Sequence, residues 1–219
     1  MYLINAIYFK GSWKYQFDKT KTSNAEFYKE DGSIVNQQQM QQQSTFNYYE
    51  NNLLQLIELP YGNGNFSMYV LLPINGKITD NISSSLTDEN WKNWCDSLTQ
   101  QKVVVELPKF QIKWGNLIND ELINMGLGVA FDSNNADFRD IDGSTDLQIS
   151  RVIHNTFIEV NEEGTEAAAV TVIEIGNTLA LGTDSIKYFT ADRPFIFMIK
   201  ENTTGCILFI GKVVEPVTD

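Results

Sequence analysis

The chain has 219 residues, of which 42% are hydrophobic and 12% aromatic, enough to bury a core of substantial size. Charged residues make up 20% and the formal net charge is −12, which argues against a disordered chain and against nucleic-acid or anionic-membrane partners, since both need basic patches. No apolar run reaches the roughly 18 residues that a membrane-spanning helix needs.

The chain opens on an apolar run. Tyr2–Phe9 is rich in Ile, Tyr and Phe and predicts a buried strand, which Gly11–Trp13 breaks. No basic region or cleavage site accompanies it, so it is not a signal peptide. A start inside a strand suggests a truncated chain, and we expect the unpaired apolar edge at Tyr2–Phe9 to make it poorly stable or prone to aggregation.

Two pairs of strands and a polar strand between them are predicted next. Glu26–Lys29 and Ile34–Val35 flank a turn with Asp-Gly at its centre. The Gln-rich run Gln37–Gln43 predicts a polar strand or a sheet edge. Leu53–Leu59 and Met68–Leu72 predict apolar strands around a glycine-rich turn, with Pro60 and Pro73 marking their ends.

Helical spacing appears after these strands. Ile78–Leu98 predicts a helical region with Thr87 as a cap, and Leu117–Met125 predicts a short helix that Gly126 stops. Val103–Ile112 between them predicts a strand in which Pro108 implies an edge or a bulge.

The last third predicts more strands. Gln148–Val160 alternates as a long strand does, and Glu162–Asp184 is rich in Gly, Ala and Thr. Phe195–Ile199 and Cys206–Val214 predict a hairpin of apolar strands that must be covered on both faces. The fold class is therefore mixed α and β, dominated by strands, with helices packed on sheets.

Catalytic and metal motifs are absent from the sequence. Cys95 and Cys206 have no metal-like spacing and are predicted to be free thiols. There is one histidine, no G-x-S-x-G and no phosphate loop, and Gly126–Gly128 lacks the third glycine of a dinucleotide fingerprint. We therefore expect no enzyme activity, no cofactor and no metal.

Six short motifs give the chain a family resemblance. Asn5–Trp13 (NAIYFKGSW) resembles the segment that ends the third strand of the main serpin sheet, and the other motifs recur in serpins in the same order. These are Leu59-Pro60-Tyr61, Leu71-Leu72-Pro73, Leu107-Pro108-Lys109-Phe110, Asp192-Arg193-Pro194-Phe195 and Phe209-Ile210-Gly211-Lys212-Val213. The chain thus resembles the C-terminal portion of a serpin, a suicide inhibitor of proteases.

The resemblance implies an α+β fold with large mixed and antiparallel sheets, packed helices and an exposed reactive loop at about residues 162–187. Residues 1–219 would form one partial domain that lacks the N-terminal helical part of a complete serpin. The complete protein is expected to be a monomer, either extracellular or cytoplasmic.

The most specific motif is the hinge that begins this loop, Glu162-Glu163-Gly164-Thr165-Glu166-Ala167-Ala168-Ala169. In the family, the cleaved loop inserts as a new strand into the main sheet, and a strand must alternate its side chains between two faces. One set, Thr165, Ala167, Ala169 and Thr171, is small and suits a packed face. The other, Glu166, Ala168, Val170 and Val172, carries the charge. Gly164 supplies conformational freedom, and no proline interrupts Glu162–Asp184.

Three further site assignments come from the resemblance. It implies a reactive bond at Thr178–Leu179, with Leu179–Ala180 or Leu181–Gly182 as alternatives. It also implies that Asn5 and His154 form a lock where the sheet opens, and that Lys109 and Glu162 form an ion pair.

The loop composition indicates the target. No Lys or Arg occurs between Arg151 and Lys187, whereas the pocket of a trypsin-like protease needs a cation. The expected partner is an elastase-like, chymotrypsin-like or cysteine protease that prefers small or apolar residues. Two alternatives stay open, which are a non-inhibitory serpin and an inactive truncated fragment.

Overall fold

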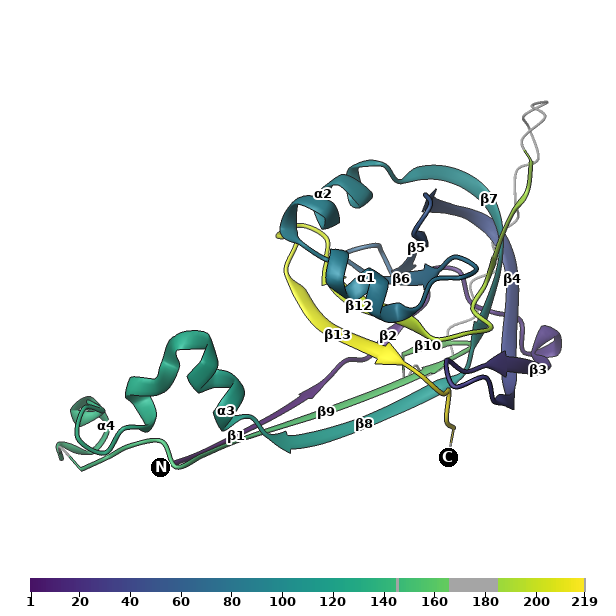
Figure 1. The fold of residues 1–219 in the computed structure, drawn as a ribbon. Helices are drawn as coiled ribbons and strands as arrows, with labels where there is room; N and C mark the ends of the chain where they lie inside the picture. The colour runs from purple at the N-terminus through teal and green to yellow at the C-terminus, as the bar shows by residue number, and fades with distance from the viewer. Residues whose placement is uncertain (145, 166–184, 219) are drawn as a thin grey trace. The chain divides into compact units, whose positions relative to one another are not determined.

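The computed structural model describes residues 1–144, 146–165 and 185–218, and the chain divides into two compact units (Figure 1). The first consists of Met1–Phe9 and Ile112–Ile158, and the second of Lys10–Gln111 and Glu159–Asp219. Strands predominate and the helices are short, so the α+β class predicted from the sequence is confirmed.

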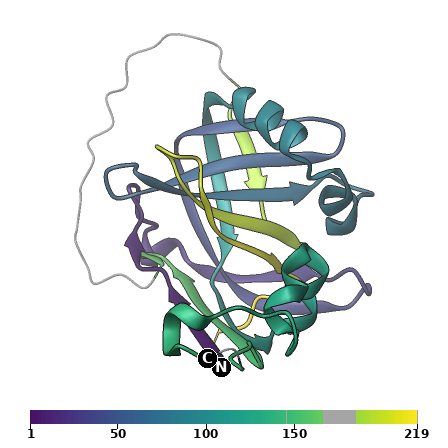
Figure 2. The same ribbon diagram turned by 90° about the vertical axis from the view of Figure 1, so that its left-hand side faces the viewer.

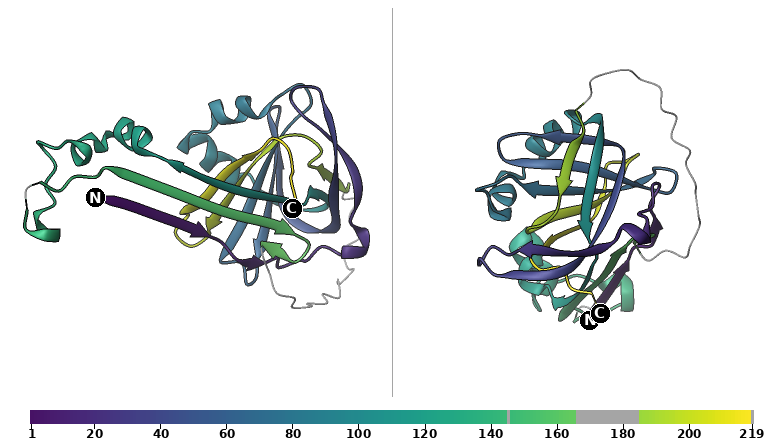
Figure 3. Two further views of the ribbon diagram at one scale, coloured as in Figure 1. Left: turned by 90° about the horizontal axis from the view of Figure 1, so that it is seen from below. Right: turned by 90° about the vertical axis from the view of Figure 1, so that its right-hand side faces the viewer.

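The first unit is built on parallel pairing. Strand β1 (Tyr2–Tyr8) pairs with β9 (Arg151–Asn161), with Tyr2 opposite Arg151 and Tyr8 opposite Phe157. The two strands lie side by side in both views of Figure 3. Strand β8 (Phe110–Leu117) also pairs with β9, so β9 has a strand neighbour besides β1.

The prediction that Tyr2–Phe9 is buried is wrong. Tyr2 and Ile4 are 68% and 70% exposed, respectively. Within the described part of the chain, β1 pairs with β9 alone. The apolar composition gives the strand, but burial depends on neighbours from other parts of the chain.

Short helical segments follow β8 in the first unit. They are α3 (Asn119–Leu122), a five-residue π-turn (Ile123–Leu127), a 3₁₀ turn (Gly128–Phe131) and α4 (Arg139–Asp142). The helix predicted over Leu117–Met125 is shorter than expected, because Leu117 belongs to β8 and α3 ends at Leu122. Gly126 has a φ of 99°, a left-handed conformation that interrupts the π-turn.

The second unit contains an eight-stranded sheet in which strand order follows β11-β7-β4-β5-β6-β12-β13, with β3 paired to β4. All pairs are antiparallel except β11 with β7. The strands are β3 (Ser23–Tyr28), β4 (Ile34–Glu50), β5 (Leu54–Tyr61), β6 (Phe66–Pro73), β7 (Thr99–Pro108), β11 (Lys187–Thr190), β12 (Phe195–Glu201) and β13 (Ile207–Val213).

The Gln-rich run lies inside this sheet. It forms part of β4, where Gln39 pairs with Ser23 of β3 on one side and Pro108 of β7 on the other. The predicted polar strand is confirmed. In this run β3 pairs with β4 up to Gln39 and β7 pairs with it from Gln39 onward, so among the described pairings only Gln39 has a paired strand on both sides.

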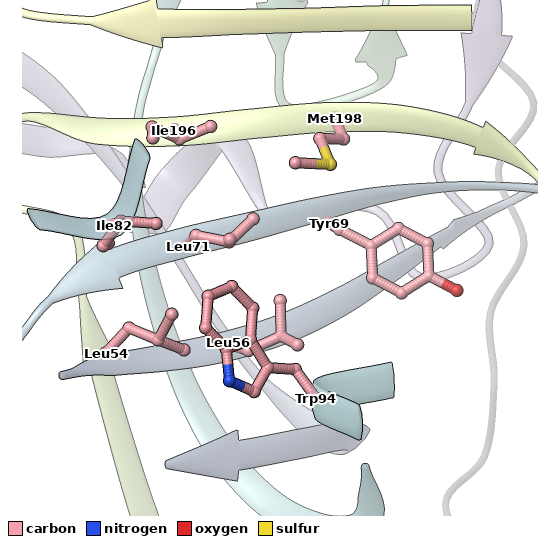
Figure 4. Packing of buried hydrophobic residues seen from close by; sticks show 8 residues of the cluster. All are labelled: Leu54, Leu56, Tyr69, Leu71, Ile82, Trp94, Ile196 and Met198. Carbon is pink, nitrogen blue, oxygen red and sulfur yellow. The ribbon is translucent and has the colours of Figure 1, made fainter. Parts of the chain in front are cut away.

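Two helices cover part of the sheet of the second unit. The predicted helical region forms α1 (Thr79–Ser85) and α2 (Asp88–Asp96), and Thr87 caps α2 by accepting a hydrogen bond from the Asn90 backbone N–H at 3.2 Å. Ile82 and Trp94 pack into a cluster with strand residues, shown in Figure 4. Its strand members are Leu54, Leu56, Tyr69, Leu71, Ile196 and Met198.

Two strand predictions need correction. The single strand expected over Val103–Ile112 is two strands, because β7 ends at Pro108, which has no N–H for the ladder, and β8 begins at Phe110. The hairpin of β12 and β13 forms as predicted (Figure 2), but Ile210 is 59% exposed. Leu208 is also 41% exposed, whereas Phe209 between them is buried, so β13 is not covered on both faces.

Candidate functional site

The hinge begins with a tight turn at the end of β9, in the second unit. The Asn161 Oδ1 atom accepts hydrogen bonds from the backbone N–H groups of Glu163 at 3.0 Å and Gly164 at 3.3 Å. This turn reverses the chain, so that the two-residue strand β10 (Gly164–Thr165) runs antiparallel to the end of β9.

Strand β10 has a neighbour on each side. Gly164 pairs with Asn161 of β9 and with Ser12 of β2 (Gly11–Ser12), and Thr165 pairs with Val160 and Gly11. The segment Gly11–Trp13, predicted only to break a strand, thus also forms one side of the hinge. Both residues of β10 are therefore already hydrogen-bonded as a strand inside a sheet.

Gly164 is required at its position. Its φ is +149°, which L-residues rarely adopt, and a Cβ atom there would lie 2.1 Å from the Gly11 carbonyl oxygen and 2.7 Å from the Ser12 Cα. The sequence prediction of conformational freedom at Gly164 agrees with this geometry, but the close approach of β2 is an additional constraint.

Thr165 is fully buried and bonded to an aromatic stack. Its Oγ1 atom lies 2.7 Å from the hydroxyl oxygen of Tyr61, whose ring stacks on Trp13 at a centroid distance of 4.4 Å. The Trp13 indole N–H donates to the Asn161 carbonyl at 2.9 Å. Burial raises the pKa of the Tyr61 hydroxyl, which therefore stays protonated and able to donate.

Glu162 and Lys109 lie together, as the resemblance implied. The Lys109 Nζ atom is 3.1 Å from Glu162 Oε2, and the Thr22 hydroxyl donates to Oε1 at 2.8 Å. Burial raises the pKa of the Glu162 carboxyl, but hydrogen bonds from its own backbone, Thr22 and Lys109 outweigh burial, so the pKa falls below its ordinary value. Glu162 is 6% exposed, so its charge is held in a sheltered site.

Asn5 and His154 face each other in the first unit. They are direct partners in the parallel register of β1 and β9, and Asn5 Nδ2 lies 3.3 Å from His154 Nδ1. The Thr156 hydroxyl lies 3.2 Å from the second ring nitrogen, and the Trp114 ring lies 5.9 Å from the imidazole. Both ring nitrogens of His154 therefore have a polar neighbour.

Comparison with protein families shows which family the chain belongs to. The family described as serpin (serine protease inhibitor) matches residues 1–216 of the chain. The chain belongs to the serpin family.

Several serpins resemble this chain over nearly all of its length. A serpin-like protein of Methanosarcina acetivorans is 41% identical, with 98% of this chain and 50% of the relative covered. Human leukocyte elastase inhibitor is 37% identical over 98% of this chain and 58% of its own length. Bovine antithrombin-III is 36% identical over 99% and 47%. The chain spans about half the length of the curated relatives that it matches.

Part of the serpin loop lies outside the described residues. This applies to the hinge residues Glu166, Ala167, Ala168 and Ala169, to the later members of the two alternating sets, and to the reactive bond Thr178–Leu179. Of the hinge, the structure describes Glu162–Thr165, and it places Thr165 on a buried face, as its small side chain suggested.

Sequence reasoning missed several residues around the serpin hinge. Trp13 and Tyr61 stand in two of the family motifs, but nothing in their spacing along the chain signals that their rings stack. The roles of Asn161 in the turn and Thr22 beside Glu162 carry no local signal either, because each depends on register between distant segments.

Two searches of the described residues found nothing further. No helix among them is long and apolar enough to cross a membrane. No three His, Cys, Asp or Glu side chains in that part of the chain gather as metal ligands would. Cys95 and Cys206 are both free, as predicted.

Proposed function

We propose that the whole protein inhibits proteases as a suicide substrate. A protease cleaves the reactive loop at Thr178–Leu179, the hinge then inserts as a strand between β9 and β2, and the acyl-enzyme is trapped. The observation that carries this proposal is β10, because Gly164 and Thr165 already pair with both neighbours that the inserted strand would have. In this role the protein is a substrate that stops the protease and is not itself a catalyst.

The residue pattern supports continued insertion beyond Thr165. Side chains in a strand alternate, so Ala167, Ala169 and Thr171 would follow Thr165 onto the buried face, and each is small. Each new backbone hydrogen bond contributes roughly 0.5–1.5 kcal/mol, so about ten residues bonded on both sides gain on the order of 10 kcal/mol. That gain is comparable to the stability of a whole domain and makes insertion effectively irreversible.

The two polar pairs fit this role as controls on insertion. Asn5 and His154 bond across the β1–β9 pair, which has to separate if the new strand is to lengthen. Lys109 and Glu162 fix the residue at which the hinge starts. We propose that the first pair keeps the sheet closed before cleavage and that the second sets the origin of the loop.

The proposed target is a protease that accepts small or apolar residues, of the elastase-like, chymotrypsin-like or cysteine class. The stretch between Arg151 and Lys187 has no basic residue to enter a trypsin-like pocket. Among the relatives, the human protein is named as an inhibitor of leukocyte elastase, which accords with this preference.

Complex formation tests the proposal. The whole protein, incubated with a panel of such proteases and with trypsin, should form a covalent complex that survives SDS with a member of the panel. Thr165→Arg should turn the inhibitor into a substrate, because a charge would have to enter the buried face. Thr203→Arg, at an exposed turn position, serves as the matched control.

Two outcomes would contradict the proposal. If Thr165→Arg forms complexes at the wild-type stoichiometry, the hinge does not insert as described. If the wild-type loop is cleaved and no complex forms with any protease, the non-inhibitory alternative takes its place.

A further inference from the structure

The dipeptide Asn-Gly occurs twice in the sequence, at Asn63-Gly64 and at Asn75-Gly76. The first lies in the turn between β5 and β6, and the second lies in the turn that leads from β6 to α1. Both asparagine residues are exposed, so access of water does not distinguish the two sites.

An asparagine that precedes glycine can react with its own backbone. Once a hydroxide ion has taken the proton of the glycine N–H, the nitrogen attacks Cγ of the asparagine side chain. A bond forms between this nitrogen and Cγ, the bond from Cγ to Nδ2 breaks, and ammonia leaves behind a cyclic imide. Water then opens the ring at one of its two carbonyls, which gives aspartate or isoaspartate without oxidation or reduction. Glycine favours the attack because it has no side chain to crowd the nitrogen.

The turn at Asn75 leaves the reacting groups unrestrained. It is closed by a hydrogen bond from the Lys77 N–H to the Ile74 carbonyl at 3.0 Å, which passes over the two residues between them. Within the described residues, neither the Gly76 N–H nor the Asn75 side chain has a hydrogen-bond partner. The nitrogen and Cγ are therefore free to approach each other in the folded protein.

The turn at Asn63 holds the same two groups in place. The Gly64 N–H donates to the Tyr61 carbonyl at 2.7 Å, and the Asn63 Oδ1 atom accepts from the Asn65 N–H at 3.2 Å. The Asn202 amide also donates to the Gly64 carbonyl at 2.9 Å, so a neighbouring turn fixes this part of the backbone. These bonds have to open locally before Gly64 can attack Asn63.

We propose that Asn75 is a site of spontaneous deamidation and isomerisation in the folded protein, and that its hydrogen bonds protect Asn63 from the same reaction. The product is aspartate or isoaspartate at position 75, formed with water as the co-reactant and ammonia as the leaving group. No enzyme is needed. Asparagine is one of the thermolabile residues, so this turn is where the protein ages first.

The modified turn lies in a connection that is anchored at both ends. The Ile74 N–H donates to the Leu53 carbonyl at 3.1 Å, and Thr79 at the start of α1 donates to Glu30 Oε1 from its N–H at 3.1 Å and its hydroxyl at 2.6 Å. Isoaspartate routes the backbone through Cβ and Cγ and lengthens this connection. Either product at Asn75 also adds a negative charge to the turn.

Timed incubation of the folded protein in mildly alkaline buffer tests the assignment. Tandem mass spectrometry of its peptides detects the mass gain from amide to carboxylate and locates it, and a methyltransferase specific for isoaspartate labels the rearranged product. Asn75 should convert at least about tenfold faster than Asn63, because two hydrogen bonds must open before Asn63 reacts.

Two variants and one solvent condition serve as controls. Asn75→Ser should lose the mass gain and the isoaspartate label in this peptide, whereas Asn63→Ser should leave conversion of Asn75 unchanged. In guanidinium chloride, where the folded turns are lost, Asn63 and Asn75 should convert at similar rates.

Several results would overturn the assignment. Equal conversion of Asn63 and Asn75 in the folded protein would show that the hydrogen bonds give no protection. The same follows if Asn63 stays about tenfold slower in guanidinium chloride, since the difference would then belong to the local sequence. An Asn75 that converts in guanidinium chloride and not in the folded protein would reject the open turn as a reactive site.

Discussion

Two features of the structure require glycine at position 164. One is a backbone φ angle in the left-handed region, and the other is the close approach of β2. Gly164→Ala should therefore lower the free energy of unfolding by about 3 kcal/mol or more, because backbone strain and a steric clash add together. Gly32→Ala is the matched control, since Gly32 has a φ of +83° with no atom within 4 Å of an added Cβ, and strain alone should cost about 1–2 kcal/mol. Denaturant unfolding measures both, and equal losses would show that the approach of β2 is not restrictive.

The carboxyl of Glu162 links stability to pH. Its pKa is lower in the folded state, so the bonds it makes contribute stability above its unfolded pKa, and this contribution is lost as pH falls through the folded pKa. Glu162→Gln should reduce stability at pH 7, and the difference from wild type should shrink as pH falls below the ordinary value of 4.5. Unfolding curves from pH 7 to about pH 3 test this. A difference that grows in acid would reverse the assigned sign, and Glu121→Gln, at an exposed site, should show none.

For single residues, the sequence predicts those features that depend on neighbouring positions in the chain. Alternation, applied to the strand that the family resemblance implies, places Thr165 among the small, inward-facing side chains, and it is buried. Its partner Tyr61 is separated from it by more than a hundred residues, so their hydrogen bond depends on how two different sheets place β5 and β10. Pairwise contacts of this kind leave no trace in the spacing of residues along a chain.

Among the elements, the positions of the strands were easier to predict than their burial. β-branched and aromatic residues mark β1, β12 and β13 correctly, because such side chains fit an extended backbone. Their burial differs, with β12 largely covered and β1 largely exposed. An apolar strand has the same composition in both settings, so composition alone cannot distinguish a strand whose faces are covered from one whose faces are exposed.

The side-chain contact between Asn5 and His154 should help to hold β1 and β9 together. Asn5→Ala removes the side-chain contact with His154, and we expect a loss of about 1 kcal/mol in stability together with faster spontaneous loss of inhibitory activity on warming. Ile4→Ala, on the same strand and 70% exposed, is the control. Inhibition assayed after timed incubation gives the rate. An Asn5→Ala protein that keeps its activity as long as wild type would remove the lock from the mechanism.

At the scale of the whole molecule, the intact inhibitor should be less stable than its cleaved form. An elastase-like protease should cut between Asn177 and Gly182, a stretch outside the described residues, and insertion should then add two rows of backbone bonds. We expect the melting temperature of the complete protein to rise by more than about 10 °C after cleavage. Mass spectrometry of the fragments locates the cut, and thermal melts before and after it measure the gain. An unchanged melting temperature would mean that no strand was added.

The pairing of Gly164 and Thr165 with β9 and β2 also fixes how a longer strand could grow. Starting a new row in a sheet requires the choice of a register and the closing of a loop, and both are entropically unfavourable. Here the first two residues are already paired, so under the proposed mechanism the strand would lengthen residue by residue from one fixed end. A single residue inserted directly after Thr165 would keep this start but exchange the two faces for everything that follows, and would turn Glu166 and its charge toward the interior.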